Sequence, residues 1–413
     1  MSFMMNLRMA TANKLRMQLL SFLCWGLRWC PSSWTRGLHV SWRDAVAEDY
    51  GVSPPDFYGE VLHSRVSVPM FDGVKTEGML SVLGDGKGGP AAGTRPTILV
   101  RTPYGSQNNR AVAALFVERG FNYLIMDTRG RGDSEGDFFP VQHEKEDGRA
   151  VVEWVKRQPF SDGRLGTHGV SYMGMTCWAA FDCAEIEVAV PALCSSSIFD
   201  IAYPSDGAVA LELVAMWSYL LSLMATRPRF ATMILLEAFF QRIIYAGHRF
   251  QKVVRAACEG LPLRDIDLRL VKHRIPYIQG GLENPRADMP YWDQRNRLAE
   301  ISKPMAGKVH LIAGFHDIFC TQQIHDYLAL QKHGTKVALT VGPWHHWQIG
   351  SFLQFVIRTI IQEYQMHFLE KETVRPDGSV LPSHSPDMPV EIYVTGAEEW
   401  RRMASWPPPA RQY

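Results

Sequence analysis

The sequence has few of the features that mark nucleic-acid-binding or metal-binding proteins. Its 43 Lys/Arg and 42 Asp/Glu leave a net charge of +1, and no compact run of basic residues occurs. This balance gives no basis for nucleic-acid binding. The cysteines lack the spacing of a zinc or thioredoxin motif and are odd in number, at positions 24, 30, 177, 183, 194, 258 and 320. We therefore expect buried free thiols and no disulfide scaffold.

Long apolar runs are also missing. The apolar stretch Leu19–Leu27 has nine residues, and Leu213–Ala225 has 13 residues and follows Glu212. A membrane-spanning helix needs about 20 apolar residues, so we expect no stable membrane span. The 413 residues and the hydrophobic content of 46% instead predict a globular protein with more than one domain.

Acidic residues are absent from positions 1–43, where the charged residues are Arg8, Lys14, Arg16, Arg28, Arg36 and Arg43. Three interpretations of this leader are open: an organelle transit peptide, a signal or anchor built on Leu19–Leu27, or a mis-assigned start. We place the transit peptide first, which predicts a mitochondrial or other organellar location, and a cytoplasmic one otherwise. Folded structure is expected to begin near Asp49.

One glycine-flanked serine is the main candidate for chemistry. Gly169-Val170-Ser171-Tyr172-Met173-Gly174 lies between a short apolar run and a run rich in Ala, Cys and Trp. This order predicts a strand, a tight turn and a helix, with Ser171 on the turn. Such a turn lifts the hydroxyl clear of the backbone and leaves the Tyr172 N–H free to face a developing oxyanion. Because ordinary turns also contain this pattern, the motif needs partners elsewhere.

An acid and two histidines follow at the ends of later predicted strands. Val309–Ala313 leads to Asp317, and Val337–Val341 leads to His345 and His346. The order Ser, Asp, His is that of α/β hydrolases, and open α/β sheets bind ligands at the carboxyl ends of their strands. Histidine can accept the serine proton near neutral pH, and a carboxylate fixes the histidine tautomer.

Each partner also has a plainer interpretation. Asp317 could cap a helix that starts near Thr321, the histidines could be surface residues, and Gly342-Pro343-Trp344 could be only a turn. The agreement of chain order, residue type and strand-end position favours the catalytic interpretation.

Several strings together resemble the cocaine esterase / Xaa-Pro dipeptidyl-peptidase-like family of serine hydrolases. They are Arg101-Thr102-Pro103-Tyr104-Gly105, Asp127–Gly136, Gly169–Gly174, Gly314–Asp317 and Gly342-Pro343-Trp344-His345-His346. Met173 replaces the second glycine of the general Gly-x-Ser-x-Gly motif, but Ser-Tyr-x-Gly is the form that this family carries. The string Asp127–Gly136 lacks the Lys-Ser/Thr of a phosphate-binding loop and is expected to be a structural turn. The resemblance implies an α/β-hydrolase fold without a required metal or cofactor.

The resemblance also implies roles for five residues. Ser171 would be the nucleophile, Asp317 the acid and His346 the base, because the family motif is Gly-Pro-Trp-x-His. Tyr104 follows the first core strand and would supply its phenol to the oxyanion hole, beside the Tyr172 N–H. Without the resemblance, Tyr104 is a turn tyrosine packed on the sheet.

The alternation of strands and helices is interrupted in the middle of the chain. We expect an α/β-hydrolase domain at 44–200 and 305–370, and a helical cap over the active site at 201–304. Long helices are predicted at Ala208–Ala225 and Ala231–Phe250.

The C-terminal part departs from the family. Relatives continue past the histidine into a β-jelly-roll domain, whereas 67 residues follow His346 here. Pro389–Gly396 resembles the first strand of that domain, so residues 371–413 are expected to be its truncated start. A lone strand would have no sheet to join, and uncovered surfaces and edges favour association. We therefore expect a homo-oligomer.

The expected activity is that of a serine hydrolase that cleaves carboxylic ester or amide bonds through an acyl-enzyme on Ser171. Its substrates would be small-molecule esters, amides or short peptides. One alternative is an Xaa-Pro dipeptidyl-peptidase or acylase of the same family, although no acids can be assigned to hold a free substrate amine. Another is a non-catalytic hydrolase-fold protein disabled by loss of the C-terminal domain. A membrane-anchored interaction protein would rest on the leader alone.

Overall fold

The computed structural model describes residues 52–57, 59–204, 207–227, 229–231, 233–234, 246–295, 305, 307–346, 349–371, 373–374, 380–381 and 387–408. The predicted leader, with Cys24 and Cys30, lies outside the described residues. The strands are β1 (Val61–Pro69), β2 (Lys75–Leu83), β3 (Arg95–Thr102), β4 (Asn122–Asp127), β5 (Ser161–Val170), β6 (Ile186–Ala192), β7 (Lys308–Gly314), β8 (Lys336–Gly342), β9 (Thr373–Val374), β10 (Val380–Leu381), β11 (Val390–Val394) and β12 (Glu399–Met403). The helices are η2 (Ser106–Asn108), α3 (Arg110–Val117), α4 (Glu144–Lys156), α5 (Tyr172–Ala179), α6 (Phe199–Ala202), α7 (Leu211–Thr226), α9 (Ala246–Glu259), η3 (Leu263–Asp265), α10 (Ile266–Val271), α11 (Pro276–Glu283), η4 (Pro290–Trp292), α13 (Cys320–Lys332) and α14 (Ile349–Leu369).

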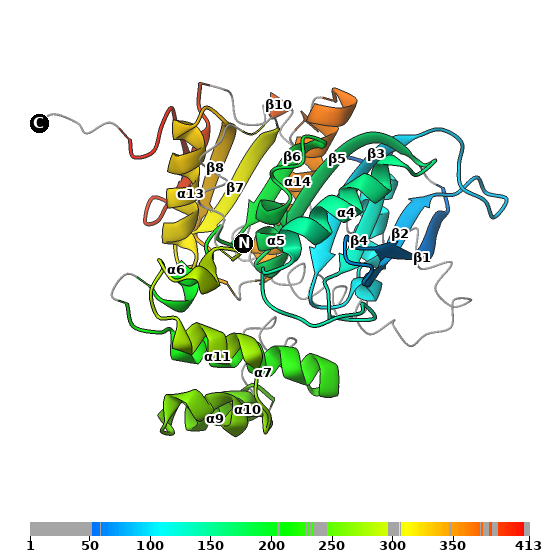
Figure 1. The fold of residues 1–413 in the computed structure, drawn as a ribbon. Helices are drawn as coiled ribbons and strands as arrows, with labels where there is room; N and C mark the ends of the chain where they lie inside the picture. Colours follow the sequence, from blue (N-terminus) through cyan, green and yellow to red (C-terminus); the bar gives the residue numbers. More distant parts are fainter. Residues whose placement is uncertain are drawn as a thin grey trace, which may run out of the picture.

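A ten-stranded sheet runs through the molecule in the order β1-β2-β4-β3-β5-β6-β7-β8-β11-β12 (Figure 1). Within the run from β4 to β11 in this order, each strand is parallel to the next one. Strands β1 and β2 form a hairpin, because they pair antiparallel on either side of the Asp72-Gly73 turn. The parallel strands bring their carboxyl ends to one edge of the sheet, where a site can form.

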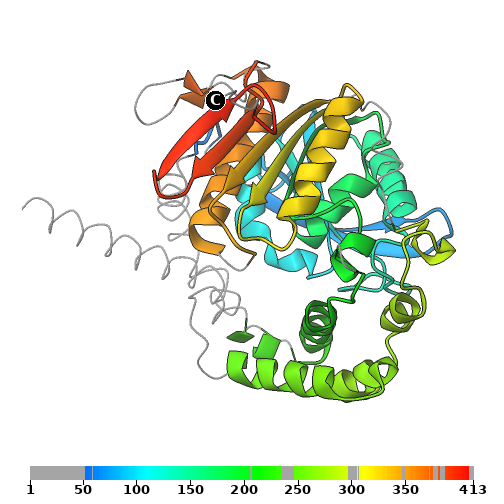
Figure 2. The same ribbon diagram turned by 90° about the vertical axis from the view of Figure 1, so that its left-hand side faces the viewer.

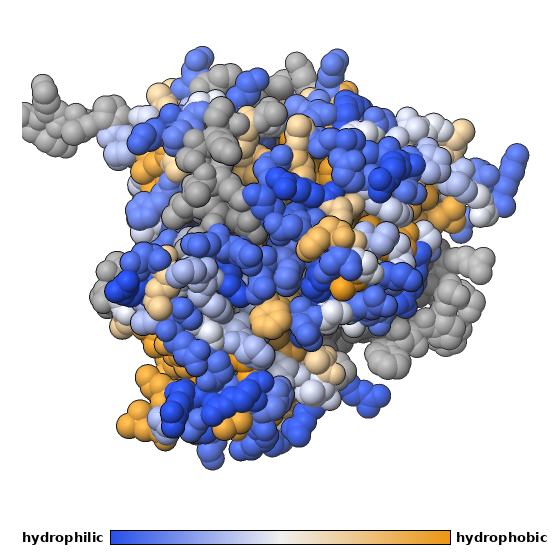
Figure 3. All heavy atoms as spheres, in the orientation of Figure 1, coloured by the Kyte–Doolittle hydropathy of each residue, from blue (hydrophilic) through white to orange (hydrophobic). Residues whose placement is uncertain are grey.

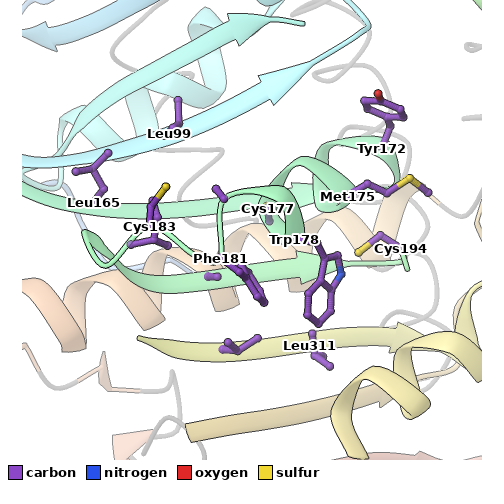
Figure 4. Packing of buried hydrophobic residues seen from close by; sticks show 14 of the residues in the cluster. Leu99, Leu165, Tyr172, Met175, Cys177, Trp178, Phe181, Cys183, Cys194 and Leu311 are labelled. Atoms are coloured by element: carbon purple, nitrogen blue, oxygen red, sulfur yellow. The ribbon is translucent and has the colours of Figure 1, made fainter. Parts of the chain in front are cut away.

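Helices cover both faces of the sheet, and alternate strand residues point to opposite sides. Leu99 of β3 belongs to the apolar cluster beneath α4, α5 and α13, whereas its neighbours Ile98 and Val100 belong to the cluster beneath α3 and α14. Figure 4 shows Trp178, from α5, pointing toward the strand that carries Leu311. This two-sided burial explains why the central strands read as continuous apolar runs.

The region between β6 and β7 is helical, as the sequence predicted. Its helices α7, α9, α10 and α11 lie below the sheet in Figure 1 and again in Figure 2, on the side where α6 follows β6. They bury an apolar cluster of their own. The predicted helix Ala208–Ala225 is α7; of the predicted helix Ala231–Phe250, residues 235–245 lie outside the described residues, and α9 begins at Ala246. No helix in the described ranges is long and apolar enough to cross a membrane.

The expectation that the C-terminal strand would lack a sheet is wrong. Strand β11 pairs parallel with β8, with Val390 opposite Leu339 and Ile392 opposite Val341, and β12 follows antiparallel (Figure 2). The physical reason is burial: Val390 is fully buried in the main core. On the neighbouring strand, Trp400 stacks on Phe355 of α14 with ring centroids 5.4 Å apart. These contacts extend the hydrolase sheet by two strands.

Candidate active site

Ser171 lies in the tight turn between β5 and α5, as predicted. Its φ of 61° and ψ of −127° are values that non-glycine residues rarely adopt. Backbone hydrogen bonds hold this conformation: the Ser171 N–H donates to Ala192 O (2.9 Å), and Ser171 O accepts from the Gly174 N–H (2.8 Å). Strain of this kind persists only where the surrounding structure determines it.

The tight turn Gly169–Gly174, which we call the elbow, has a glycine at each end. Close packing requires both of these glycines. A Cβ on Gly169 would come within 2.3 Å of the Met173 backbone, and one on Gly174 within 2.5 Å of Cys194 Sγ. The turn therefore closes on itself more tightly than any side chain would permit. The sequence pattern Gly-x-Ser-x-x-Gly has its physical cause in these two contacts.

Asp317 follows β7, and its carboxylate has two partners. One oxygen, Oδ1, accepts from the Phe319 N–H (2.9 Å), just before α13 begins at Cys320. The other, Oδ2, lies 2.9 Å from Nδ1 of His346. The first bond is a turn contact to the N-cap residue Phe319, and no side chain caps α13 there, so the same fully buried carboxylate fixes its own loop and faces His346.

His346 follows β8 and completes a continuous chain of hydrogen bonds. Its Nε2 lies 3.0 Å from Ser171 Oγ, while Nδ1 faces Asp317. The ring of Phe319 meets the imidazole edge to face, with centroids 5.1 Å apart. The neighbouring His345 has no part in these two bonds, in agreement with the choice of His346.

The two strand-end loops that carry Asp317 and His346 are fastened to each other. The Phe315 N–H donates to Gly342 O (2.9 Å), and the His316 N–H donates to Trp344 O (3.0 Å). A Cβ on Gly314 would lie 2.4 Å from Trp344 O, and one on Gly342 would lie 2.2 Å from the Trp344 ring. The glycines of both motifs therefore let the loops approach closely enough to align the acid and the base.

Tyr104 and Tyr172 contribute different groups to the site. The Tyr104 phenol accepts a hydrogen bond from Trp217 Nε1 (3.3 Å). Burial raises the pKa of Tyr104, and its hydrogen bonds with Trp217 and with the Ser171 side chain oppose that rise. The Tyr172 phenol instead points away into the core, where it donates to Glu144 Oε1 (2.9 Å) and accepts from the Val141 N–H (2.8 Å). Since Tyr172 is the first residue of α5, its N–H has no acceptor within the helix.

A buried ion pair between Arg101 and Glu144 lies beneath the elbow, and the sequence did not predict it. Arg101 Nη1 donates to Glu144 Oε2 (2.8 Å), Arg101 Nη2 donates to Thr176 O (3.1 Å), and the other Glu144 oxygen holds Tyr172. Removing one member would leave an uncompensated buried charge. The pair fixes α5, and with it the elbow, against β3 and α4. Arg101 is the first residue of one of the strings that resemble the family. Nothing in the sequence, however, indicated that Arg101 pairs with Glu144.

The string Asp127–Gly136 has the structural role that was expected. The Asp127 carboxylate accepts from the Ser106 N–H (2.6 Å) and from the Ser106 hydroxyl (3.0 Å). Arg131 Nε donates to Pro103 O (3.0 Å). Both contacts hold the loop on which Tyr104 stands.

A cavity of about 520 Å³ opens in front of Ser171 and His346. The helical insertion supplies much of its wall, mostly through apolar side chains of α6 and α7 such as Ile201, Leu220 and Met224. Trp217 of α7 also lines it and stacks on the Tyr172 ring, with centroids 5.7 Å apart. Trp217 is a residue of the cavity wall that the sequence did not reveal, because most positions of α7 are apolar.

The cysteines and metal-ligating groups do not form a second reactive centre in the part of the chain that the structure describes. Cys177, Cys183 and Cys194 are buried free thiols, and Cys258 and Cys320 are partly buried free thiols. Burial raises the pKa of Cys177 to about 12 and that of Cys320 to about 11, so both are thiols at neutral pH. The described residues contain no cluster of three or more His, Cys, Asp or Glu suited to a metal ion.

A parallel sheet with Ser171, Asp317 and His346 on the loops after β5, β7 and β8 defines the α/β-hydrolase class of fold. Residues 89–348 match the family described as X-Pro dipeptidyl-peptidase (S15 family). This match covers more than half of the sequence, and the chain belongs to that family of hydrolases.

Individual relatives agree with this assignment. The chain is 29% identical over 374 residues to the cocaine esterase of Rhodococcus sp. (strain MB1 Bresler), covering 85% of this chain and 61% of that one. Its fold is similar to that of an aminopeptidase from a marine sediment Thaumarchaeota archaeon (TM-score 0.59, 18% identity, 86% and 61% of the two chains). An α-amino acid ester hydrolase gives a TM-score of 0.59 at 19% identity, over 86% and 60% of the two chains. The chain thus spans about three fifths of the length of these relatives.

Proposed function

We propose that the chain is a serine hydrolase that cleaves carboxylic esters through an acyl-enzyme on Ser171. The continuous hydrogen bonds Asp317–His346–Ser171, at 2.9 and 3.0 Å, carry this proposal. His346 Nε2 takes the hydroxyl proton as Oγ attacks the ester carbonyl, and then gives that proton to the departing alkoxide, which leaves as the alcohol. Water then attacks the acyl-enzyme, with His346 again taking and returning the proton, and the carboxylic acid leaves.

The oxyanion formed in each step needs donors. The Tyr172 N–H and the Tyr104 hydroxyl are the two groups proposed for it, since both adjoin Ser171. The Asp317 carboxylate would orient the imidazole of His346 and stabilise the imidazolium that forms on it. No metal or cofactor is required by these steps.

The wall of the cavity favours esters over peptides with a free amino terminus. Among the described lining residues, Arg295 and His346 are basic, and no Asp or Glu lines the cavity. A substrate ammonium group would therefore be desolvated without a counter-charge, which is unfavourable. Xaa-Pro dipeptidyl-peptidase activity is the second candidate, because the family is described by that activity. Amide cleavage by an acylase would use the same steps.

The test compares hydrolysis of 4-nitrophenyl butyrate and alanyl-prolyl-4-nitroanilide by the wild-type chain and by Ser171→Ala. We expect ester turnover that falls by about 10³-fold or more in the variant, with the folded state checked by circular dichroism. Anilide turnover that depends on Ser171 would instead support the peptidase. Folded protein without Ser171-dependent activity on either compound would favour the non-catalytic hydrolase-fold protein.

A further inference from the structure

Arg295, just after η4, is a buried cation that lines the same cavity as Ser171 and His346. It is only 7% exposed. Its Nη1 donates to Tyr291 O, its Nη2 donates to Gln142 Oε1, and its guanidinium lies 3.9 Å from the centre of the Tyr291 ring. Every one of these partners is neutral.

No carboxylate in the described residues forms an ion pair with Arg295, and its Nε has no hydrogen-bond acceptor there. Arg101 and Arg129 are similarly buried, yet they pair with Glu144 and with Asp147. A guanidinium has five N–H groups, and the two contacts of Arg295 engage only part of them. The hydrogen-bonding capacity of this cation is therefore largely unused inside a substrate-sized cavity.

A buried charge without a counter-ion is unfavourable by several kcal/mol. Burial lowers the pKa of Arg295, but a guanidinium stays protonated in proteins, so the charge persists. Carbonyl and aromatic partners spread the charge without neutralising it. An anionic ligand group would offset the penalty, because a carboxylate matches the planar fork of donors.

We propose that Arg295 is an anion-binding subsite of the cavity, and that the preferred substrate is an ester with a carboxylate at the end remote from the scissile bond. This inference rests on the proposed function. The cavity of about 520 Å³ has room for a ligand of this size. The absence of Asp and Glu from its described lining leaves the approach of a carboxylate unopposed.

Two esters with the same six-carbon acyl chain separate charge recognition from chain recognition. Mono-4-nitrophenyl adipate has a terminal carboxylate, and 4-nitrophenyl hexanoate has a methyl group there. We expect Arg295→Met to raise KM for the adipate ester about tenfold or more, while kcat/KM for the hexanoate stays the same or rises. Arg295→Lys should retain part of the preference. Spontaneous hydrolysis is subtracted with an enzyme-free blank.

Arg286→Met is the matched control, because Arg286 is an exposed arginine of the same insertion that pairs with Asp288. It should behave as the wild type with both esters. Arg295→Met should not lower the melting temperature, since it removes a buried unpaired charge. An equal effect of Arg295→Met on the two esters would overturn the proposal and leave Arg295 a structural tie between η4 and Gln142.

A binding measurement keeps this inference separable from the catalytic proposal. Monomethyl adipate is titrated calorimetrically into Ser171→Ala protein and into the same protein with Arg295→Met. We expect about tenfold weaker binding in the second protein. If Ser171→Ala leaves ester hydrolysis intact, the proposed function fails, yet the titration still decides whether Arg295 binds the carboxylate. Equal binding by the two proteins would refute the subsite.

Discussion

The strained backbone of Ser171 is maintained by its neighbours rather than by the serine itself. Gly169 packs against the Met173 backbone and Gly174 packs against the buried Cys194, with no room for an added carbon at either glycine. Beneath them, Arg101 and Glu144 anchor the helix that starts at Tyr172. The proposed nucleophile is thus positioned by contacts within the protein itself, which is the arrangement that preorganised catalysis needs.

Tyr104→Phe and Tyr172→Phe form a matched pair at this scale. Tyr104→Phe removes the proposed oxyanion donor and should lower kcat for 4-nitrophenyl butyrate by about 10²-fold. Its loss of stability should be small, because the bond from Trp217 Nε1 that is lost with the phenol is long (3.3 Å). Tyr172→Phe keeps the backbone N–H but leaves Glu144 without one donor, so it should lower stability by about 1–3 kcal/mol. Its kcat should fall much less. Equal kcat values in wild type and Tyr104→Phe would contradict the role given to that phenol.

The three residues that the structure brings together as the proposed triad could be selected from the sequence, because each follows a strand that is recognisable on its own. Asp317 and His346 stand a few residues past apolar runs, and parallel strands bring such ends together. The Arg101–Glu144 pair and Trp217 could not be predicted this way. Their partners are distant in sequence. No local pattern distinguishes a buried charged residue from an exposed one. Nor does any local pattern distinguish an apolar helix that lines a cavity from one that packs only in the core.

Helix α14 is joined to β7 by a polar cluster on the face opposite the elbow. Glu363 accepts from Lys308 Nζ (2.6 Å) and faces Nδ1 of His310 (2.9 Å), and His310 Nε2 lies 2.9 Å from Thr340 Oγ1. Burial alone would raise the pKa of Glu363, but the hydrogen bonds and charges of His310 and Lys308 bring it down to about 2. The ionised carboxylate therefore stabilises the packing of α14 on the sheet.

Glu363→Gln should destabilise the protein by about 3 kcal/mol at pH 7, because it leaves the buried ends of Lys308 and His310 without their carboxylate. The folded-state pKa lies below the unfolded value, so this stabilisation is present above pH 4.5 and is lost as the pH falls toward 2. Urea unfolding at pH 7 and pH 3 measures it: the gap between wild type and variant should shrink at the lower pH. If the difference in stability between wild type and variant is the same at both pH values, the variant loses packing contacts and not the interactions of an ionised carboxylate.

At the level of elements, sequence patterns predicted the parallel strands and the helical insertion but not the position of β11. Its own residues read as a strand, yet nothing in Val390–Val394 specifies which edge it joins. That choice depends on the burial of Val390 beside Leu339 and on the stacking of Trp400 against Phe355. Both contacts join residues about 50 positions apart, and they are visible only once the sheet exists.

At the scale of the whole molecule, the buried carboxylate of Asp326 connects helix α13 to the segment that leads into the helical insertion. Asp326 of α13 accepts from the Ser196 N–H (3.0 Å) and from the Ser196 hydroxyl (2.6 Å), and Ser196 lies between β6 and α6. Burial raises the pKa of Asp326 to about 7, against the opposing effect of these hydrogen bonds. The side chain is therefore neutral in mildly acidic solution and becomes a buried anion as the pH rises.

Asp326→Asn should change the pH dependence of stability. The folded-state pKa lies above the unfolded value of 3.8, so the wild type loses stability between pH 4 and pH 7, by a few kcal/mol, as the unfolded chain ionises first. The amide of the variant cannot ionise. The stability of the variant relative to the wild type should therefore increase from pH 4 to pH 7 and stay constant above pH 7. Urea midpoints at pH 5 and pH 8 provide the measurement. Parallel pH profiles for the two proteins would exclude the titration of Asp326.

Self-association remains a prediction for this chain. In Figure 3 the visible face over the sheet is mainly hydrophilic, and hydrophobic residues gather over the helical insertion in the lower part of the view. Leu261, between α9 and η3, is 83% exposed. The edge strand β12 is not apolar, because Glu399, Arg401 and Arg402 stand along it, and charged side chains on an edge discourage pairing with another sheet.

The elbow and its base are 175 residues apart in the chain, and this distance has a consequence for synthesis. While the polypeptide leaves the ribosome, Ser171 emerges long before β7 and β8, so the proposed nucleophile exists without its proposed base for much of translation. Contacts that link remote segments also form late in folding, since closing a long loop is entropically costly. Hydrolysis would therefore begin only when the sheet is complete through β8, and its onset would report the finished molecule rather than any part of it.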